Sequence, residues 1–252
     1  MCIRDSSKWS TIKRAKASND AKRGQLFTKL SKEIIVAAKN GGANLDSNFR
    51  LRMAVQKAKD NNMPSDNIDR AIKRAVGDGS NSDMEEIVYE GYGPGGTAIL
   101  VQTVTDNRKR TGSQIRAIFT KSGGSLAEVG AVAWQFNQKC VISVNISDEK
   151  QDELALLCID AGADDFESSD SSFDIFCALD KVSSVQDVIE PLAGNTSVDI
   201  SMMANNTVML DDSTSMKILK LLDEFEDSDD VQKVFTNADF SEEVLNSYQN
   251  NS

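Results

Sequence analysis

The stretch EEIVYEGYGPGGTAILVQTV, residues 85–104, decides how the middle of this chain is organised. Its two ends, EEIVYEGY and TAILVQTV, are rich in β-branched and aromatic residues, which favours strands. The glycines between them, Gly91-x-Gly93-x-x-Gly96, have the spacing of a dinucleotide-binding turn. That turn must follow a strand and open a helix whose first amides receive the pyrophosphate. Here the glycines open a second strand and no Gly-Lys-Ser/Thr follows, so the stretch predicts a β-hairpin.

Upstream of the hairpin, the spacing of apolar residues is typical of helices. Apolar residues recur every three or four positions from Asn19 to Asn40, before Gly41-Gly42. A second stripe begins after a cap at Asp46 or Ser47 and stops near Asn61-Asn62, and a third runs from Ser65 to Gly77. We expect a three-helix bundle, preceded by an N-terminal arm.

Downstream of the hairpin, helices and strands alternate. TDNRKRTGSQIRAIFTKSGG predicts a helix capped by Asp106 or Asn107, and AVAWQF at 131–136 predicts a third strand. From Cys140 the pattern is strand, helix, strand, strand, helix, strand, the ferredoxin-like order. TVML, the helix SMKILKLLDEFE and the strand VQKVFT then complete the middle module. We interpret the acidic run DEFEDSDD at 223–230 as a solvated helix end and loop, and the alternative is a site for a basic partner.

These patterns predict an α+β multidomain protein, in which an N-terminal three-helix bundle is followed by two ferredoxin-like α/β modules, the second inserted in the first. The expected domains are a basic helical bundle with its arm at 1–80, an α/β module at 81–138 plus 205–240, an inserted ferredoxin-like module at 139–204, and a tail at 241–252.

Composition narrows the function classes. The chain has no histidine, which excludes Ser-His-Asp and Cys-His catalysis and imidazole acid–base chemistry. Cys2, Cys140, Cys158 and Cys177 lie far apart, which predicts neither a metal site nor a disulfide framework and favours a reducing compartment. The last three lie in apolar stretches, which favours buried thiols. The apolar runs fall far short of the roughly 20 residues that span a bilayer. We expect no catalytic residue, metal, cofactor, membrane contact or small-molecule substrate, although carboxylate-based metabolic chemistry stays open as a third class.

Charge is segregated along the chain, whose net charge is -11. Residues 1–80 carry 17 Lys and Arg against 8 Asp and Glu, and residues 81–139 carry 6 against 6. Residues 140–252 carry 5 against 25. A basic head on an acidic body favours a nucleic-acid partner for the head.

Two groups of residues are candidates for phosphate contact. One lies in the head, where the ring of Trp9 is suited to stack on a base. The other opens the helix after the hairpin, where the helix dipole attracts anions. The alternative is that both groups form a hydrated surface. The candidates are Lys8, Trp9, Lys13, Arg14, Lys16, Lys22, Arg23, Arg50, Arg52, Arg70, Lys73, Arg74, Arg108, Lys109 and Arg110.

Four long stretches carry a family resemblance. SKWSTIKRAKASNDAKRGQLFTKLSKEI, NFRLRMAVQKAKDNNMPSDNIDRAIKRA, YEGYGPGGTAILV and TDNRKRTGSQIRAIFTKSGGSL resemble the YebC family, which also includes a mitochondrial translational activator. The resemblance covers about residues 6–240. It implies three domains, a helical bundle plus two α/β modules, and a non-enzymatic role in gene expression. Bacterial members are described as probable transcriptional regulators that bind DNA, and others as ribosome-associated factors that help translation through proline-rich stretches.

The expected function is therefore a DNA-binding transcriptional regulator of YebC type. The alternative is a translational activator that associates with the ribosome and its RNA and relieves stalling at proline-rich stretches. The family usually begins Met-small-Gly-His before Ser-Lys-Trp, whereas MCIRDS precedes Ser7-Lys8-Trp9 here, which indicates an artefact in residues 1–6. We expect a cytoplasmic protein, or a mitochondrial one if a native extension is missing. The oligomeric state stays open, with a monomer slightly favoured.

Overall fold

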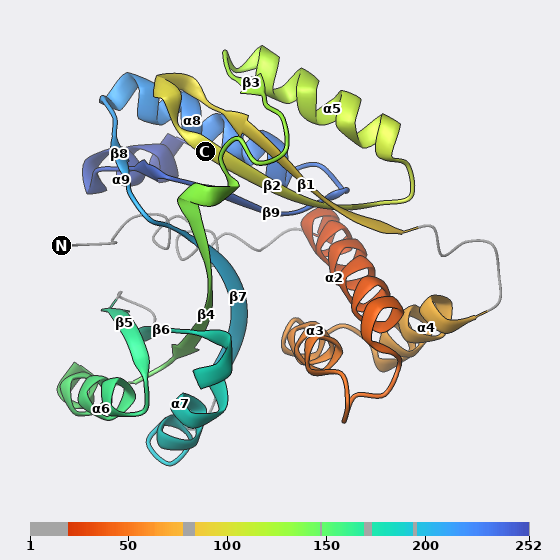
Figure 1. Ribbon diagram of the computed structural model, residues 1–252, viewed down its shortest axis with the longest axis vertical. Helices are drawn as coiled ribbons and strands as arrows, with labels where there is room; N and C mark the ends of the chain where they lie inside the picture. The colour runs from red at the N-terminus through yellow and green to blue at the C-terminus, as the bar shows by residue number, and fades with distance from the viewer. Residues whose placement is uncertain (1–19, 78–83, 147, 169–172, 194–195, 252) are drawn as a thin grey trace. The chain divides into compact units, whose positions relative to one another are not determined.

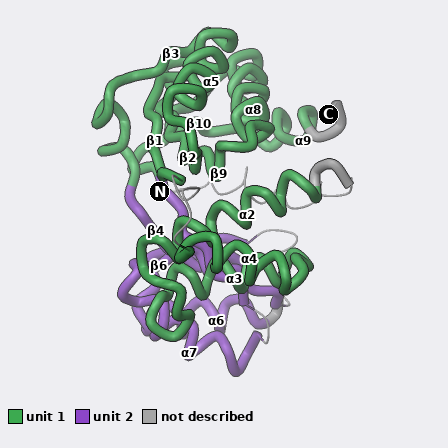
Figure 2. Tube along the Cα trace, turned by 90° about the vertical axis from the view of Figure 1, so that its right-hand side faces the viewer, with its two compact units in different colours: residues 1–136, 204–252 green, residues 137–203 purple. Residues whose placement is uncertain are grey.

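The computed structural model describes residues 20–77, 84–146, 148–168, 173–193 and 196–251 (Figure 1). The chain divides into two compact units, which Figure 2 colours separately. Unit 1 comprises residues 1–136 and 204–252, and unit 2 comprises residues 137–203. Both units combine helices with sheets, which confirms the predicted α+β class.

A helical bundle opens the described part of unit 1. Its helices are α2 (Asp20–Gly41), α3 (Phe49–Asp60) and α4 (Ser65–Val76). Their buried stripes meet in one core, which also contains Met84 and Val104 from the sheet region. The cap of α3 is Asn48 and not Asp46 or Ser47, because the Asn48 side-chain oxygen accepts from the backbone N–H of Leu51 at 3.0 Å. The predicted three-helix bundle is confirmed, and its core continues into the sheet.

The hairpin is confirmed. Strands β1 (Glu85–Tyr92) and β2 (Ala98–Thr105) pair antiparallel along their whole length and are joined by the 3₁₀ turn η1 (Pro94–Gly96). Gly95 has a φ of 72°, which a residue with a side chain rarely adopts. A Cβ on Gly91 would lie 2.4 Å from Cζ of Phe119. The glycines therefore turn the chain and admit a packed aromatic ring, and they hold no phosphate-binding helix start.

The sheet of unit 1 is buried on both faces of β2. Its strand order is β3-β1-β2-β9 (Figure 1). Ile99 and Val101 on β2 share a core with residues of helices α5 and α8, whereas Val104, which points to the opposite face, joins the core of the helical bundle. The remaining elements are α5 (Arg108–Lys121), β3 (Ser125–Leu126), α8 (Asp212–Glu226) and β9 (Val231–Thr236).

Two segments of unit 1 differ from the prediction. The stretch AVAWQF is not a strand: Ala133–Gln135 form the 3₁₀ helix η2, and strand β4 begins only at Phe136. The cause is Glu90, whose carboxylate accepts backbone N–H groups from Gly130, Val132 and Ala133 at 2.6–2.8 Å and so curls the loop. Residues 242–251, expected to be a tail, form helix α9 (Glu242–Asn251), which packs against α8. The short strands β8 (Val208–Met209) and β10 (Ala238–Asp239) pair in parallel.

Unit 2 has the predicted β-α-β-β-α-β order. Its strands lie in the order β5-β6-β4-β7, and α6 and α7 contribute to a core that holds Cys140, Cys158 and Cys177 as buried free thiols. The predicted burial of these three cysteines is confirmed. The elements are β4 (Phe136–Val144), α6 (Asp148–Asp160), β5 (Ala163–Ser168), β6 (Phe173–Cys177), η3 (Leu179–Lys181), α7 (Val182–Ile189) and β7 (Thr196–Ala204).

Candidate nucleic-acid interface

One group of candidate cations lies on the last two turns of α4. Arg70, Lys73 and Arg74 are exposed, while Ile68 and Ala71 on the same helix are buried in the bundle core. Their spacing of three and four residues brings the three cations together on the solvent side. The first turns of α4 carry exposed Asp66 and Asp69 instead. A polyanion would therefore meet α4 at its C-terminal half.

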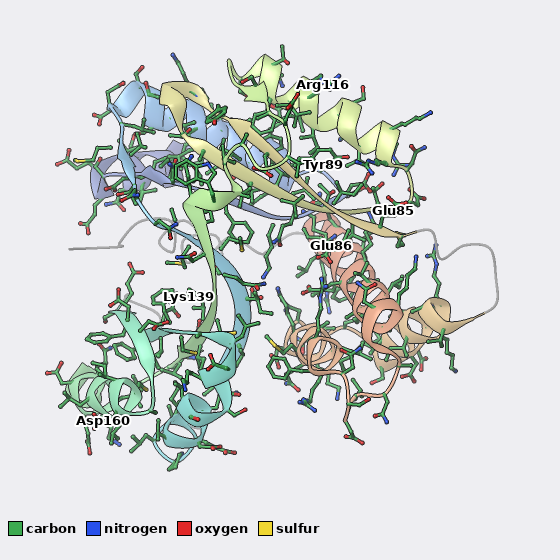
Figure 3. All side chains as sticks on the ribbon, in the orientation of Figure 1. Glu85, Glu86, Tyr89, Arg116, Lys139 and Asp160 are labelled. Carbon is green, nitrogen blue, oxygen red and sulfur yellow. The ribbon has the colours of Figure 1, made fainter. Side chains whose placement is uncertain are left out.

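A second group lies on α5. Asn107 caps this helix, because its side-chain oxygen accepts from the backbone N–H of Arg110 at 3.1 Å. Arg108 and Lys109 follow in the first turn and are exposed. Arg116, labelled in Figure 3, is exposed on the same helix seven residues after Lys109 and so lies on the same side. Sequence reasoning missed Arg116, although helical spacing from Lys109 would have found it.

Two of the candidate cations are neutralised within unit 1. Arg50 makes a bidentate ion pair with Glu86, with N–O distances of 2.6 and 3.0 Å. Nη2 of Arg110 lies 2.9 Å from Asp106 Oδ1 and 3.0 Å from Asp230 Oδ2. The hydrogen bonds to these carboxylates raise the pKa of both guanidinium groups. We therefore leave Arg50 and Arg110 out of the proposed contact surface.

Two further candidate arginines lie against aromatic rings. The guanidinium carbon of Arg23 is 5.4 Å from the centre of the Phe27 ring, and that of Arg52 is 5.6 Å from Phe49. Both arginines are exposed. Lys22 lies in α2, but its side chain is outside the described part. The other candidates of the head, Lys8, Trp9, Lys13, Arg14 and Lys16, precede the first described residue.

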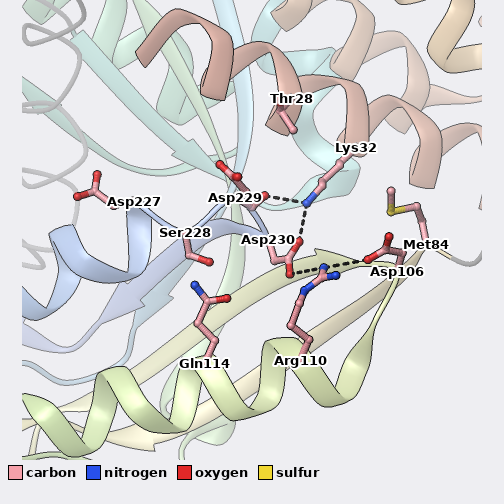
Figure 4. Close-up of a pocket in the computed structure, with 10 residues that line it drawn as sticks. All are labelled: Thr28, Lys32, Met84, Asp106, Arg110, Gln114, Asp227, Ser228, Asp229 and Asp230. Atoms are coloured by element: carbon pink, nitrogen blue, oxygen red, sulfur yellow. Dashed lines mark hydrogen bonds and ion pairs between the residues drawn. The ribbon is translucent and has the colours of Figure 1, made fainter. Parts of the chain in front are cut away.

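A cavity of about 420 Å³ lies where α2 meets the α8–β9 turn (Figure 4). At its centre Nζ of Lys32 is 2.7 Å from Asp230 Oδ1, and both residues are buried. Burial alone would raise the pKa of the Asp230 carboxyl, but hydrogen bonds from Lys32, Thr111 and Arg110 lower it to about 2. The interpretation of residues 223–230 as solvated is therefore wrong at Asp230. No local pattern could show this, because the partner is 198 positions away.

The contacts at this cavity hold two parts of unit 1 together. Both of its cations, Lys32 and Arg110, pair with Asp230, so neither is left to hold an anionic substrate. Beside it Gln25 donates to the carbonyl oxygen of Asp227 at 2.6 Å and Lys29 to that of Glu226 at 2.5 Å. These carbonyls end α8, where the helix dipole favours a cation. The side chains of α2 thus fasten the helical bundle to the sheet region.

The described ranges contain neither a group of metal ligands nor a membrane-spanning helix. Within them, no three or more Asp, Glu and Cys side chains are grouped so that they could hold a metal ion. No helix there is long and apolar enough to cross a membrane.

The charges divide sharply between the two units. Residues 137–203 carry 3 Lys and Arg against 14 Asp and Glu, and the rest of the chain carries 25 against 25. The whole net charge of -11 therefore belongs to unit 2. The candidate cations all belong to unit 1.

Comparison with known proteins places the chain in a family. Residues 7–78 match the TACO1/YebC protein N-terminal domain, and residues 84–238 match the TACO1/YebC second and third domain. A probable transcriptional regulatory protein of Dehalococcoides mccartyi is 53% identical over 243 residues, which cover 96% of this chain and 97% of that protein. Another, from Natranaerobius thermophilus, is 48% identical over 246 residues, with coverage of 95% and 97%. The crystal structure of a conserved hypothetical protein from Aquifex aeolicus has the same fold, with a TM-score of 0.82, 40% identity and coverage of 91% and 96%. The chain belongs to the TACO1/YebC family.

Proposed function

We propose that this chain is a non-enzymatic, nucleic-acid-binding regulator of gene expression, acting in the cytoplasm. The observation that carries the proposal is a set of exposed cations on two helices of unit 1. They are Arg70, Lys73, Arg74, Arg108, Lys109 and Arg116, and among the described residues no ion pair joins any of them to a carboxylate.

Unpaired cations suit a phosphate backbone because their binding releases the counterions condensed on it. About six such contacts on duplex DNA give a slope of log affinity against log salt of about -5. The acidic residues of unit 2 repel a polyanion, so we assign the contact to unit 1.

We favour duplex DNA and transcriptional regulation, in agreement with the names of the relatives. Sequence-specific reading would need base-edge readers such as Arg, Asn or Gln on a helix that fits a groove, and α4 offers Arg70, Lys73 and Arg74. The exposed cations of both helices can equally contact the phosphates of ribosomal RNA. This observation supports the second candidate, a ribosome-associated translational activator that relieves stalling at proline-rich stretches.

Charge reversal of the two groups tests the proposal. The variants are Arg108→Glu with Lys109→Glu, and Lys73→Glu with Arg74→Glu. The matched control is Lys217→Glu with Lys220→Glu. Both lysines are exposed on α8 of the same unit, and their replacement changes the net charge by the same amount as each test variant. Binding to labelled duplex DNA and to a labelled ribosomal RNA fragment is measured by fluorescence anisotropy at several salt concentrations.

Each reversal of two contacts is expected to weaken binding and to make the salt slope about 2 units less negative. The control is expected to keep the slope of the wild type. Equal loss in the control and the two test variants would mean that only net charge matters, and would contradict the assignment.

Cell fractionation separates the two candidate functions. Recovery of the chain with ribosomes on a gradient supports translation. Enrichment of promoter DNA after chromatin crosslinking supports transcription.

A further inference from the structure

Helix α6 of unit 2 is apolar on two sides. Leu154, Ala155 and Cys158 are buried in the core of the unit. Leu156 and Ile159 point away from that core and are 67% and 48% exposed. One exposed leucine is ordinary, but two large apolar side chains three residues apart form a continuous strip on the outer side of a helix.

Carboxylates surround this strip. Asp152, Glu153 and Asp160 are exposed and stand four residues before, three residues before and four residues after Leu156. At this spacing each is a direct neighbour of Leu156 on the helix surface. Figure 3 labels Asp160, at the end of α6. The outer side of α6 therefore has an apolar centre and an acidic rim, within a unit that carries the whole net charge of the protein.

We propose that the outer side of α6 is a docking surface for a basic amphipathic segment of another protein. Such a segment would place its apolar residues on Leu156 and Ile159 and its lysines or arginines against the acidic rim. An apolar anchor within a polar rim is the usual arrangement of a specific protein interface. The inference stands on unit 2 alone and does not depend on nucleic-acid binding by unit 1.

Charge complementarity selects this occupant over others. Nucleic acid and anionic lipid would bring phosphates against the three carboxylates. A second copy of the chain, joined through the same surface about a two-fold axis, would place acidic rim against acidic rim. A basic protein segment satisfies the apolar centre and the rim together.

The test uses the full-length chain and a fluorescein-labelled peptide, LKKLLKLLKKLLKL, whose leucines fall on one side of a helix. A scrambled peptide of the same composition has no such side. The variants are Leu156→Ser with Ile159→Ser, and the neutral set Asp152→Asn, Glu153→Gln and Asp160→Asn. The matched control is Leu179→Ser, since Leu179 of η3 is 44% exposed in the same unit.

The amphipathic peptide is expected to bind the wild type at least about tenfold more tightly than the scrambled one. The serine variant and the neutral variant are each expected to lose about tenfold, and the control to stay within about twofold. Circular dichroism checks the helix content, and the neutral variant keeps the test valid if the serine variant unfolds.

Three outcomes would overturn the proposal. One is equal binding of the amphipathic and the scrambled peptide, which would mean that any basic peptide is attracted to the acidic unit without docking on the apolar strip. Another is unchanged binding by the folded serine variant, or by the neutral variant. The third is a wild-type dimer in analytical ultracentrifugation that the serine variant abolishes, which would assign the surface to a second copy of this chain.

Discussion

The carboxyl group of Asp230 is expected to make unit 1 less stable in acid. This group is 6% exposed and accepts hydrogen bonds from Lys32, Arg110 and Thr111 at 2.7, 3.0 and 2.7 Å. Burial opposes its ionisation, but these donors outweigh burial and lower its pKa from 3.8 to about 2. Because the folded-state pKa lies below the unfolded one, the stabilisation is complete well above pH 4 and is lost as the pH falls toward 2.

The size of this effect on stability follows from the shift in the pKa of the Asp230 carboxyl group. At about 1.4 kcal/mol per pKa unit, ionised Asp230 contributes about 2 kcal/mol to the free energy of unfolding at neutral pH. About 1 kcal/mol of this is lost by about pH 3. Asparagine does not titrate. The difference in free energy of unfolding between the wild type and Asp230→Asn is therefore expected to shrink by about 1 kcal/mol between about pH 7 and pH 3.

Tryptophan fluorescence during urea unfolding measures this difference in unit 1, because the two tryptophans, Trp9 and Trp134, both lie outside residues 137–203. The control is Asp106→Asn, which removes the other carboxylate of Arg110; the side chain of Asp106 is 58% exposed. It is expected to change stability by less than about 1 kcal/mol at either pH. A wild-type advantage over Asp230→Asn that stays constant from about pH 7 to pH 3 would mean that ionisation of Asp230 does not stabilise the fold.

Three further changes test other parts of the fold. Glu90→Gln replaces a carboxylate that accepts three backbone N–H groups, and is expected to cost about 1–3 kcal/mol in urea unfolding; a neutral effect would mean that the loop folds without it. Gly91→Ala forces a Cβ into the ring of Phe119 and is expected to cost about 1–3 kcal/mol, and a gain in stability would contradict the packing. Burial raises the thiol pKa of Cys158 and of Cys177 to about 11, so in a Cys2→Ser background these thiols are expected to react with a disulfide reagent at about pH 8 only after unfolding. Fast reaction of the folded chain would show that the core of unit 2 opens.

Periodicity predicted the elements whose burial is local. The apolar stripes of α2, α3 and α4 and the continuous apolar run of β2 are visible in the sequence, because each depends on residues that are close together in the chain. The prediction of a strand at AVAWQF was wrong because it considered only the local pattern of apolar residues. The apolar residues of this segment are typical of a strand. The carboxylate of Glu90, more than forty positions earlier, nevertheless holds its backbone in a 3₁₀ turn.

Candidate cations could be found from the sequence, but their pairing could not. Arg110 and its neighbours Arg108 and Lys109 are equivalent in the sequence, yet only Arg110 reaches Asp230, which lies in the α8–β9 turn at a separation of 120 residues. Arg50 likewise meets Glu86 from a different element. Lys32 was not a candidate, although its ion pair with Asp230 connects α2 to the α8–β9 turn. Such long-range pairs depend on tertiary packing, which spacing along the chain does not encode.

The central claim is that nucleic acid lies on the exposed cations of unit 1 and not on unit 2. Crosslinking of the full-length chain to photoreactive DNA and to photoreactive ribosomal RNA, followed by mass spectrometry, tests it most directly. We expect crosslinked peptides that contain residues 70–74 and 108–116. Crosslinks confined to residues 137–203 would contradict it.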